Sequence, residues 1–326
     1  MQAAHWPGIG ALVALVLAGA AFLALWRDPR RLIRAEFARQ RIAAGFRARR
    51  ARIGGIDWCW VEREAASADA PTLLMVHGYT GGKENWYRLC ARLGRRYRLV
   101  LPDLPGWGQS ERRPGADHGF VAQADRIAAL IAHLGGPLVL VGHSMGGGIA
   151  ALVAARYPER VSALVLLDAA GVEFAENAFG REVVEGGNPF AVEDPATLER
   201  YLGTVFHQRR ARPPLPWPGS WAYVAWRRRE AAFEQSVLER IGRSQERFLP
   251  FEEATAIGQP TLLVWGAHDR VIDPGALELY AGRIPHARRL LLPDSGHMTL
   301  MEQPDEVAAA IVDLVAETAP GSRAAG

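Results

Sequence analysis

The sequence has little cysteine and almost no lysine. Its 326 residues contain only two cysteines, Cys59 and Cys90, which are too few for a disulfide framework. They form no C-x-x-C pair, so the cysteines offer no metal or redox site. We therefore predict no metal, no cofactor and a reducing compartment. Lys83 is the only lysine, so arginine carries nearly all of the positive charge.

Positive charge is concentrated in one short segment. Residues 27–52 hold ten arginines against two acidic residues, Asp28 and Glu36, although the net charge of the whole chain is only +3. No basic patch with interleaved aromatic residues lies near the candidate catalytic residues given below. The composition therefore argues against nucleic acid as a partner.

The chain has one long hydrophobic run, near its amino terminus. Ile9–Trp26 contains no charge, and as a helix its eighteen residues would rise about 27 Å, close to the thickness of the hydrocarbon core. A secretory signal peptide is the alternative, but no lysine or arginine precedes the run. We predict a single-pass anchor over residues 1–26. The arginines that follow place the large domain in the cytoplasm, at an inner membrane.

Residues 27–55 are predicted to form a basic juxtamembrane helix or linker. Their apolar residues recur at helical spacing, which is typical of an amphipathic helix on an anionic lipid surface. A solvated linker helix is an equally good interpretation.

The rest of the chain alternates short apolar runs with helical stretches. Strands are expected at 56–61, at the edge of a sheet, and then at 71–77, 97–102, 137–142, 161–168, 260–265 and 287–292. Helices are expected at 85–94, 119–134, 147–156, 276–284 and 304–317. This order predicts a doubly wound, mostly parallel α/β sheet formed by residues 56–170 and 258–318, with a tail at 319–326.

Residues 171–257 interrupt this alternation and predict an inserted helical cap. Helices are expected at 181–187, 198–207, 221–233 and 237–243, and the proline-rich stretch 212–219 must be irregular. The cap offers eight apolar candidates for lining a pocket, although most are expected in its core: Phe174, Phe179, Phe190, Val205, Phe206, Trp217, Trp221 and Trp226.

Residues 142–146 read G-H-S-M-G, which fits the pattern G-x-S-x-G between an expected strand and an expected helix. A serine there lies on a tight turn, and the amino terminus of the following helix favours developing negative charge. The motif predicts Ser144 as a nucleophile. The alternative is a glycine-rich turn with an incidental serine.

A nucleophilic serine needs a base, and the base needs an acid that fixes its tautomer. Asp269 follows an expected strand in W-G-A-H-D, and His297 follows the last strand in D-S-G-H. The order Ser144, Asp269, His297 is the one expected of α/β-hydrolases. Asp168, at the end of another expected strand, is the alternative acid.

Residues 58–316 resemble the α/β-hydrolases through three motifs: G-H-S-M-G-G, G-A-H-D-R-V-I and S-G-H-M. The resemblance implies that Ser144 is the nucleophile, His297 the general base and then acid, and Asp269 the residue that orients it. His77-Gly78-Tyr79 is similar to the family's oxyanion loop, which implies that the backbone N–H groups of Tyr79 and Met145 stabilise the oxyanion. The stretch 101–110 matches a further loop of the family that we interpret as structural.

Serine, histidine and aspartate with an oxyanion hole perform acyl transfer, which with water is hydrolysis. Within the family, the apolar run, the basic segment and the short cap most resemble membrane-anchored monoacylglycerol lipases of the abhydrolase-domain type and bacterial lipases. We therefore expect a carboxylic ester hydrolase with a lipid-like acyl ester as substrate. The alternatives are a carbon-carbon bond hydrolase of ring-cleavage products and a non-catalytic binding module with the same fold.

Overall fold

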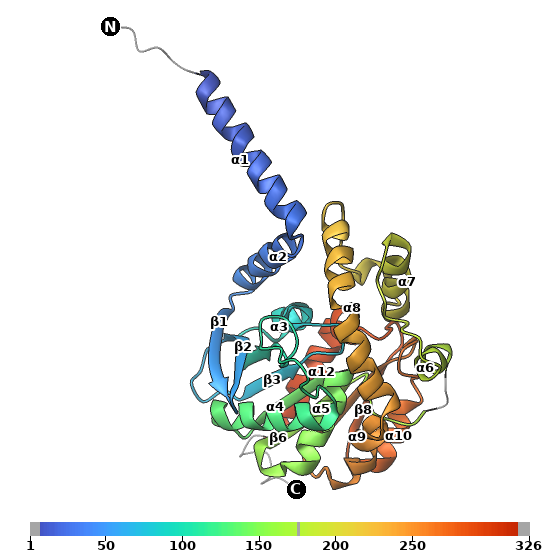
Figure 1. Cartoon of the computed structure of the whole chain (residues 1–326). Coiled ribbons are helices and arrows are strands. Elements are labelled where there is room, and N and C mark those ends of the chain that lie inside the picture. Colours follow the sequence, from blue (N-terminus) through green and yellow to red (C-terminus); the bar gives the residue numbers. More distant parts are fainter. Residues whose placement is uncertain (1–6, 175–176, 319–326) are drawn as a thin grey trace.

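The computed structural model describes residues 7–174 and 177–318 (Figure 1). The predicted tail over residues 319–326 lies outside the described residues. At the centre is an eight-stranded sheet with the order β1-β2-β4-β3-β5-β6-β7-β8. Its strands are β1 (Arg47–Ile53), β2 (Ile56–Arg63), β3 (Thr72–Val76), β4 (Arg98–Pro102), β5 (Leu138–His143), β6 (Val161–Leu167), β7 (Thr261–Gly266) and β8 (Arg288–Leu292).

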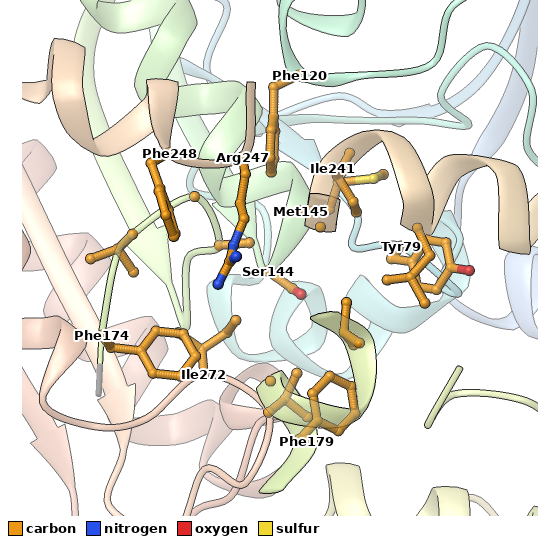
Figure 2. A pocket seen from close by; sticks show the side chains of 18 of the residues that line it. Tyr79, Phe120, Ser144, Met145, Phe174, Phe179, Ile241, Arg247, Phe248 and Ile272 are labelled. Carbon is orange, nitrogen blue, oxygen red and sulfur yellow. The ribbon is translucent and has the colours of Figure 1, made fainter. Parts of the chain in front are cut away.

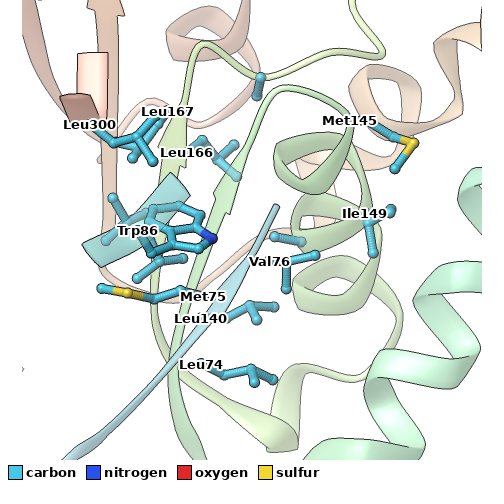
Figure 3. Packing of buried hydrophobic residues seen from close by; sticks show 14 of the residues in the cluster. Leu74, Met75, Val76, Trp86, Leu140, Met145, Ile149, Leu166, Leu167 and Leu300 are labelled. Carbon is cyan, nitrogen blue, oxygen red and sulfur yellow. The ribbon is translucent and has the colours of Figure 1, made fainter. Parts of the chain in front are cut away.

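The sheet is mostly parallel, as predicted. β2 pairs antiparallel with β1 and β4, and all pairs from β4 to β8 are parallel. The central strands are apolar along their whole length because helices cover both faces, and every residue of β5 is buried. Figure 3 shows the alternation on β3, where Leu74 and Val76 face α5 and Met75 faces Trp86.

Helices pack on both faces of the sheet. α3 and α12 pack against each other on one face, and α4, α5 and α10 cover the other. The helices of this core are α3 (Tyr87–Leu93), α4 (Phe120–Leu134), α5 (Met145–Arg156), α10 (Ala276–Arg283), α11 (Thr299–Glu302) and α12 (Pro304–Thr318), with 3-10 turns η1 (Lys83–Trp86) and η2 (Pro158–Arg160). The predicted doubly wound α/β fold is confirmed.

The strand predicted at 56–61 is present as β2, but the prediction that it forms the edge of the sheet was wrong. β1 pairs outside β2 over residues that we had assigned to a basic helix or linker. Four of its seven residues are arginines and Arg47–Arg50 are exposed, so the strand lacks the apolar pattern on which the prediction relied. The helical part of the basic segment is α2 (Arg30–Ala43).

Between β6 and β7 lies the cap, for which we keep the predicted boundaries 171–257. It contains α6 (Ala178–Val184), α7 (Pro195–Val205), α8 (Gly219–Arg243) and α9 (Leu249–Glu252), with 3-10 turns η3 (Arg209–Ala211), η4 (Gln245–Phe248) and η5 (Glu253–Ala256). The helices predicted at 221–233 and 237–243 form one helix, α8, because no proline or glycine separates them.

At the amino terminus, α1 (Pro7–Arg27) projects away from the sheet (Figure 1). Side chains at positions 7–9, 18, 21 and 22 lie outside those that the structure describes. Within the described part of the chain, no helix has the length and apolar character needed to cross a membrane. The structure therefore does not support the predicted transmembrane anchor over residues 1–26.

The amino-terminal helices contact the cap. Trp26 stacks on Trp221 of α8 with ring centroids 5.7 Å apart, and Arg229 forms an ion pair of 3.2 Å with Asp28. α2 also packs on α8, where Phe37 contacts Trp226 edge to face, and Ile33 of α2 is buried. The side of α2 that faces α8 is thus covered by protein, and the helix offers its arginines to the surroundings.

Candidate active site

Ser144 lies on the turn between β5 and α5, at the carboxyl edge of the sheet. Its φ of 54° and ψ of −121° are rare for a residue with a side chain. Its carbonyl oxygen accepts hydrogen bonds from the N–H groups of Gly147, Gly148 and Ala170. These bonds hold the turn in its strained conformation, and the Ser144 hydroxyl points into a pocket (Figure 2).

The two outer glycines of the motif are required by backbone packing. A Cβ on Gly146 would overlap the carbonyl oxygens of Val76 and His77 on the neighbouring strand. A Cβ on Gly142 would overlap the carbonyl of Gly146. The G-x-S-x-G pattern thus reflects the close approach of α5 to β3 and β5.

Asp269 and His297 come together as the sequence predicted. Asp269 Oδ2 lies 2.7 Å from His297 Nδ1, and both side chains are buried. Asp269 Oδ1 accepts from the backbone N–H groups of Val271 at 2.8 Å and Ile272 at 3.1 Å. Both carboxylate oxygens therefore have fixed partners, and His297 Nδ1 carries the proton that Oδ2 accepts.

His297 is neutral at neutral pH, because burial lowers its pKa to about 3. Its Nε2 atom is therefore free of a proton when Nδ1 donates to Asp269. Within the described residues, no hydrogen bond joins Ser144 Oγ to His297. Such bonds are often long in enzymes without substrate and shorten in the complex.

Within the described part of the chain, Asp168 forms no hydrogen bond with the His297 imidazole. Its Oδ1 accepts from the N–H of Gly266 at 2.9 Å, and its Oδ2 accepts from Thr299 Oγ1 at 2.5 Å. Burial, with the nearby charge of Asp269, raises the pKa of Asp168 well above its ordinary value. Asp168 thus ties the end of β7 to the segment after His297, and Asp269 is the acid beside the imidazole.

Tyr79 follows β3 in a loop that we call the oxyanion loop, residues 77–82. A Cβ on Gly78 would lie 3.0 Å from Ser144 Cβ, so the loop passes directly beside the candidate nucleophile. Met145 is the first residue of α5, where N–H groups have no acceptor within the helix. Both predicted oxyanion donors therefore lie next to residues at the serine turn, Tyr79 after Gly78 and Met145 after Ser144.

His77 fixes the orientation of the peptide that carries the Tyr79 N–H. The backbone N–H of Leu104 donates to His77 Nε2 at 3.1 Å, so the ring's proton must be on Nδ1. Nδ1 then donates to Gly78 O at 2.8 Å, and the N–H of Gly81 donates to the same oxygen at 3.1 Å. Because the peptide is planar and trans, the Tyr79 N–H points away from this held carbonyl.

His143 joins the serine turn to the histidine loop, a role for which the sequence gives no signal. Its Nε2 atom donates to His297 O at 2.8 Å, and the two rings lie 4.9 Å apart. Burial lowers the pKa of His143 to about 3, so the ring is neutral. The residue next to the nucleophile thus fixes the main chain of the candidate base.

The pocket above Ser144 is apolar and has a volume of about 750 Å³ including its opening to solvent. Three of the predicted cap residues line it, Phe174, Phe179 and Phe190. Further walls come from residues that no motif marks, Phe120, Val183, Leu238, Ile241 and Phe248. Val271 and Ile272, at the end of the motif G-A-H-D-R-V-I, also line the pocket. Arg247 is the one charged side chain lining the pocket in the described residues, and Figure 2 shows it between Phe174 and Phe248.

The other predicted cap residues do not line this pocket. Val205 and Phe206 are buried in the cap, and Trp217 is 78% exposed. Trp221 stacks on Trp26, and Trp226 contacts Phe37 at 6.3 Å between ring centroids. Trp221 and Trp226 thus join the cap to the amino-terminal helices.

Residues 71–304 match the family model described as the alpha/beta hydrolase fold. The chain belongs to the α/β-hydrolase family. Lipase 1 of Psychrobacter immobilis is 31% identical over 76% of this chain and 78% of its own length. Monoacylglycerol lipase ABHD6 of Mus musculus is 29% identical over 94% of this chain and 93% of its own. A membrane phospholipase A, described as a bacterial virulence factor, has a structure with TM-score 0.84 and 32% identity over 96% of this chain and 99% of that one.

This α/β-hydrolase therefore has relatives that are named lipases and phospholipases. The predicted resemblance to monoacylglycerol lipases and bacterial lipases is confirmed. The prediction that the protein is a carboxylic ester hydrolase is confirmed by the same relatives. The roles of the individual site residues stay predictions.

Proposed function

We propose that the protein hydrolyses carboxylic esters of lipids, with monoacylglycerols as the substrate class, through an acyl-enzyme on Ser144. The observation that carries the proposal is the buried 2.7 Å contact between Asp269 and His297 beside a serine that opens into an apolar pocket. Apolar walls stabilise an acyl chain by removing it from water. Similarity to monoacylglycerol lipases over nearly the whole chain supports the substrate class.

The chemistry follows from the placement of the polar atoms. His297 Nε2 takes the proton of Ser144 Oγ as the oxygen attacks the ester carbonyl carbon. The carbonyl oxygen becomes an oxyanion, which the N–H groups of Tyr79 and Met145 stabilise. His297 then gives its proton to the leaving alcohol, and Asp269 stabilises the transient imidazolium. Water then attacks the acyl carbon while His297 takes its proton, and His297 returns this proton to Ser144 Oγ as the bond to the acyl group breaks and the fatty acid leaves.

Attachment to a membrane is part of the proposal. α1 exposes several large apolar side chains, Leu12, Val13, Leu15, Val16, Leu17, Leu23 and Trp26. The arginines Arg31, Arg34 and Arg39 of α2 are exposed beside it. An exposed apolar helix next to a cationic helix fits the surface of an anionic bilayer, which would also supply the substrate.

Ser144→Ala tests the mechanism. We expect the purified protein to release fatty acid from a monoacylglycerol and from p-nitrophenyl esters, and we expect the variant to lose this activity with an unchanged circular dichroism spectrum. Undiminished hydrolysis by the variant would refute the mechanism. A folded wild-type protein that cleaves no ester would favour the carbon-carbon hydrolase or the binding module.

Vesicle flotation tests the membrane attachment. The wild-type protein should float with vesicles that contain anionic lipid, whereas Leu15→Asp/Val16→Asp should remain in the soluble fraction. The variant should keep full activity on a water-soluble ester, because both residues lie on α1, which projects away from the sheet and supplies no residue to the described lining of the pocket (Figure 1). Equal flotation of the two proteins would argue against attachment through α1.

A further inference from the structure

The cap contacts the oxyanion loop through two hydroxyl groups. The Tyr79 hydroxyl donates a hydrogen bond to the backbone carbonyl of Glu234, in the middle of α8. One residue later, Thr80 Oγ1 lies 2.9 Å from the hydroxyl of Tyr201 on α7. Two separate cap helices therefore hold two successive residues of the loop.

Among the described residues, the carbonyl and the hydroxyl of Tyr79 have hydrogen-bond partners, whereas its N–H has none. Trp107 Nε1 donates to the Tyr79 carbonyl at 2.5 Å, and the hydroxyl is bound by α8. The side chain is only 3% exposed, and its ring contacts Phe190 of the cap with centroids 5.1 Å apart. The residue is thus fixed by the core on one side and by the cap on the other, and its N–H remains for the substrate.

The cap is stiffened at the point where Tyr79 binds. Arg227 of α8 is buried inside the cap, with only 1% of its surface exposed. Its Nη2 atom lies 3.0 Å from Glu234 Oε2. The same nitrogen donates to the carbonyl of Phe190 at 2.9 Å. The ion pair lies within α8, and the hydrogen bond to Phe190 O joins this part of α8 to the segment before α7. The carbonyl that receives the Tyr79 hydroxyl therefore belongs to a fixed part of the cap.

We propose that the cap positions the oxyanion hole, with the Tyr79 and Tyr201 hydroxyls as positioning groups that hold the Tyr79 N–H in place. This inference rests on the proposed function, because it assumes that this N–H binds the oxyanion. A displaced cap releases Glu234 O and Tyr201 from the loop, and the donor then loses its alignment. The enzyme is therefore fully competent only while the cap is seated over Ser144.

The inference predicts a specific kinetic effect of removing one hydroxyl. With p-nitrophenyl acetate, whose acyl group is too small to need the cap pocket, Tyr79→Phe should lower kcat by about 10-fold and leave KM unchanged. The reason is that an oxyanion donor stabilises the transition state and hardly affects binding of the ester. Complete loss of such a donor lowers kcat by roughly 100- to 1,000-fold. Tyr201→Phe should have a smaller effect in the same direction. A trifluoromethyl ketone, which forms an oxyanion on Ser144, should bind more weakly by the same factor as kcat falls.

Tyr223→Phe is the matched control. Tyr223 is also on α8, and its hydroxyl accepts from Arg227 Nη1 at 3.3 Å without contacting the oxyanion loop. We expect kcat, KM and ketone binding to be unchanged in this variant. If Tyr223→Phe lowered kcat as much as Tyr79→Phe, the effect would not depend on contact with the oxyanion loop. That result would overturn the inference.

Amide hydrogen exchange of the peptide spanning residues 77–86 provides a readout that does not require activity. Exchange should be slow in the wild type and in Tyr223→Phe, and faster in Tyr79→Phe/Tyr201→Phe, because the loop has lost both cap contacts. Unchanged exchange in the double variant would overturn the inference. An absence of ester hydrolysis by the wild type would instead count against the proposed function, so the two failures are distinguishable.

Discussion

Asp269 Oδ2 lies 2.7 Å from His297 Nδ1, whereas the oxygens of Asp168 are bound to Gly266 and Thr299. This difference predicts opposite results for two equivalent substitutions. Asp269→Asn should lower kcat by roughly 10⁴-fold, because the amide stabilises the wrong tautomer of His297. Asp168→Asn should retain activity within about 10-fold, since an amide can still accept from Gly266 and donate to Thr299. Ester hydrolysis rates compare the two, and near wild-type activity of Asp269→Asn would refute the assignment.

His143 should be needed for rate through its bond to His297 O. His143→Ala removes the donor and should lower kcat by about 10-fold, because the imidazole of His297 is then held less firmly against Ser144. Gln places a donor near the position of the lost Nε2, so His143→Gln should restore most of the activity. Equal kcat values in the alanine and glutamine variants would show that the hydrogen bond has no such role.

The pH profile should extend into acid. Burial lowers the pKa of His297 to about 3, so the ring remains able to accept a proton well below the ordinary value of 6.5. We expect kcat/KM for a soluble ester to stay constant from pH 8 to about pH 5 and to fall only at lower pH, since this ratio reports the free enzyme. An inflection near pH 6.5 would contradict the lowered pKa.

The free energy of unfolding should also decrease in acid, because two buried histidines must remain neutral in the folded protein. The pKa values of His143 and His297 are lowered to about 3 in the folded state, against 6.5 for the exposed side chain. Between these values the unfolded chain binds protons that the folded chain does not, so the free energy of unfolding decreases as the pH falls from 6.5 towards 3. Urea unfolding at several pH values measures this decrease, and His143→Gln should make it smaller.

The single lysine should be important for stability. Lys83 Nζ lies 2.6 Å from Asp103 Oδ2 and 3.1 Å from Glu84 Oε1, and all three side chains are largely buried. Lys83→Met leaves two buried carboxylates without their cation and should cost about 3–5 kcal/mol of unfolding free energy. Arg39→Ala, which removes an exposed pair with Glu36, should cost less than about 1 kcal/mol. Similar urea midpoints for the two variants would contradict this ranking.

Chain-length selectivity should depend on the pocket wall. Ile241 of α8 lines the cavity opposite Phe179 (Figure 2), so Ile241→Trp should reduce its volume. We expect kcat/KM for long-chain p-nitrophenyl esters to fall about 10-fold relative to the acetate, whose acyl group does not reach the wall. The acetate is the internal control for the fold of the variant. An unchanged ratio would place the acyl chain elsewhere.

Much of the core could be predicted from the sequence because its strands and site residues are marked by short, contiguous sequence patterns. The strands β5 and β7, which precede Ser144 and Asp269, are buried, apolar runs, and His297 follows the last strand, β8, within a short motif. β1 was missed because an edge strand exposed to solvent needs no apolar residues, and its arginines suggested a linker. The sequence likewise could not identify Phe120, Ile241 or Arg247 as pocket residues, because they come from separate segments that meet only in the fold.

The Arg-rich edge of the sheet has a consequence for aggregation. β1 is an edge strand of the sheet and pairs with β2 on one side only. The unpaired outer side of such a strand can recruit a strand of another molecule. Arg47, Arg49 and Arg50 are exposed along this strand, so a second copy that approached in the same register would bring like charges together. The same arginines that conceal the strand in the sequence thus protect the sheet from extension by its own copies.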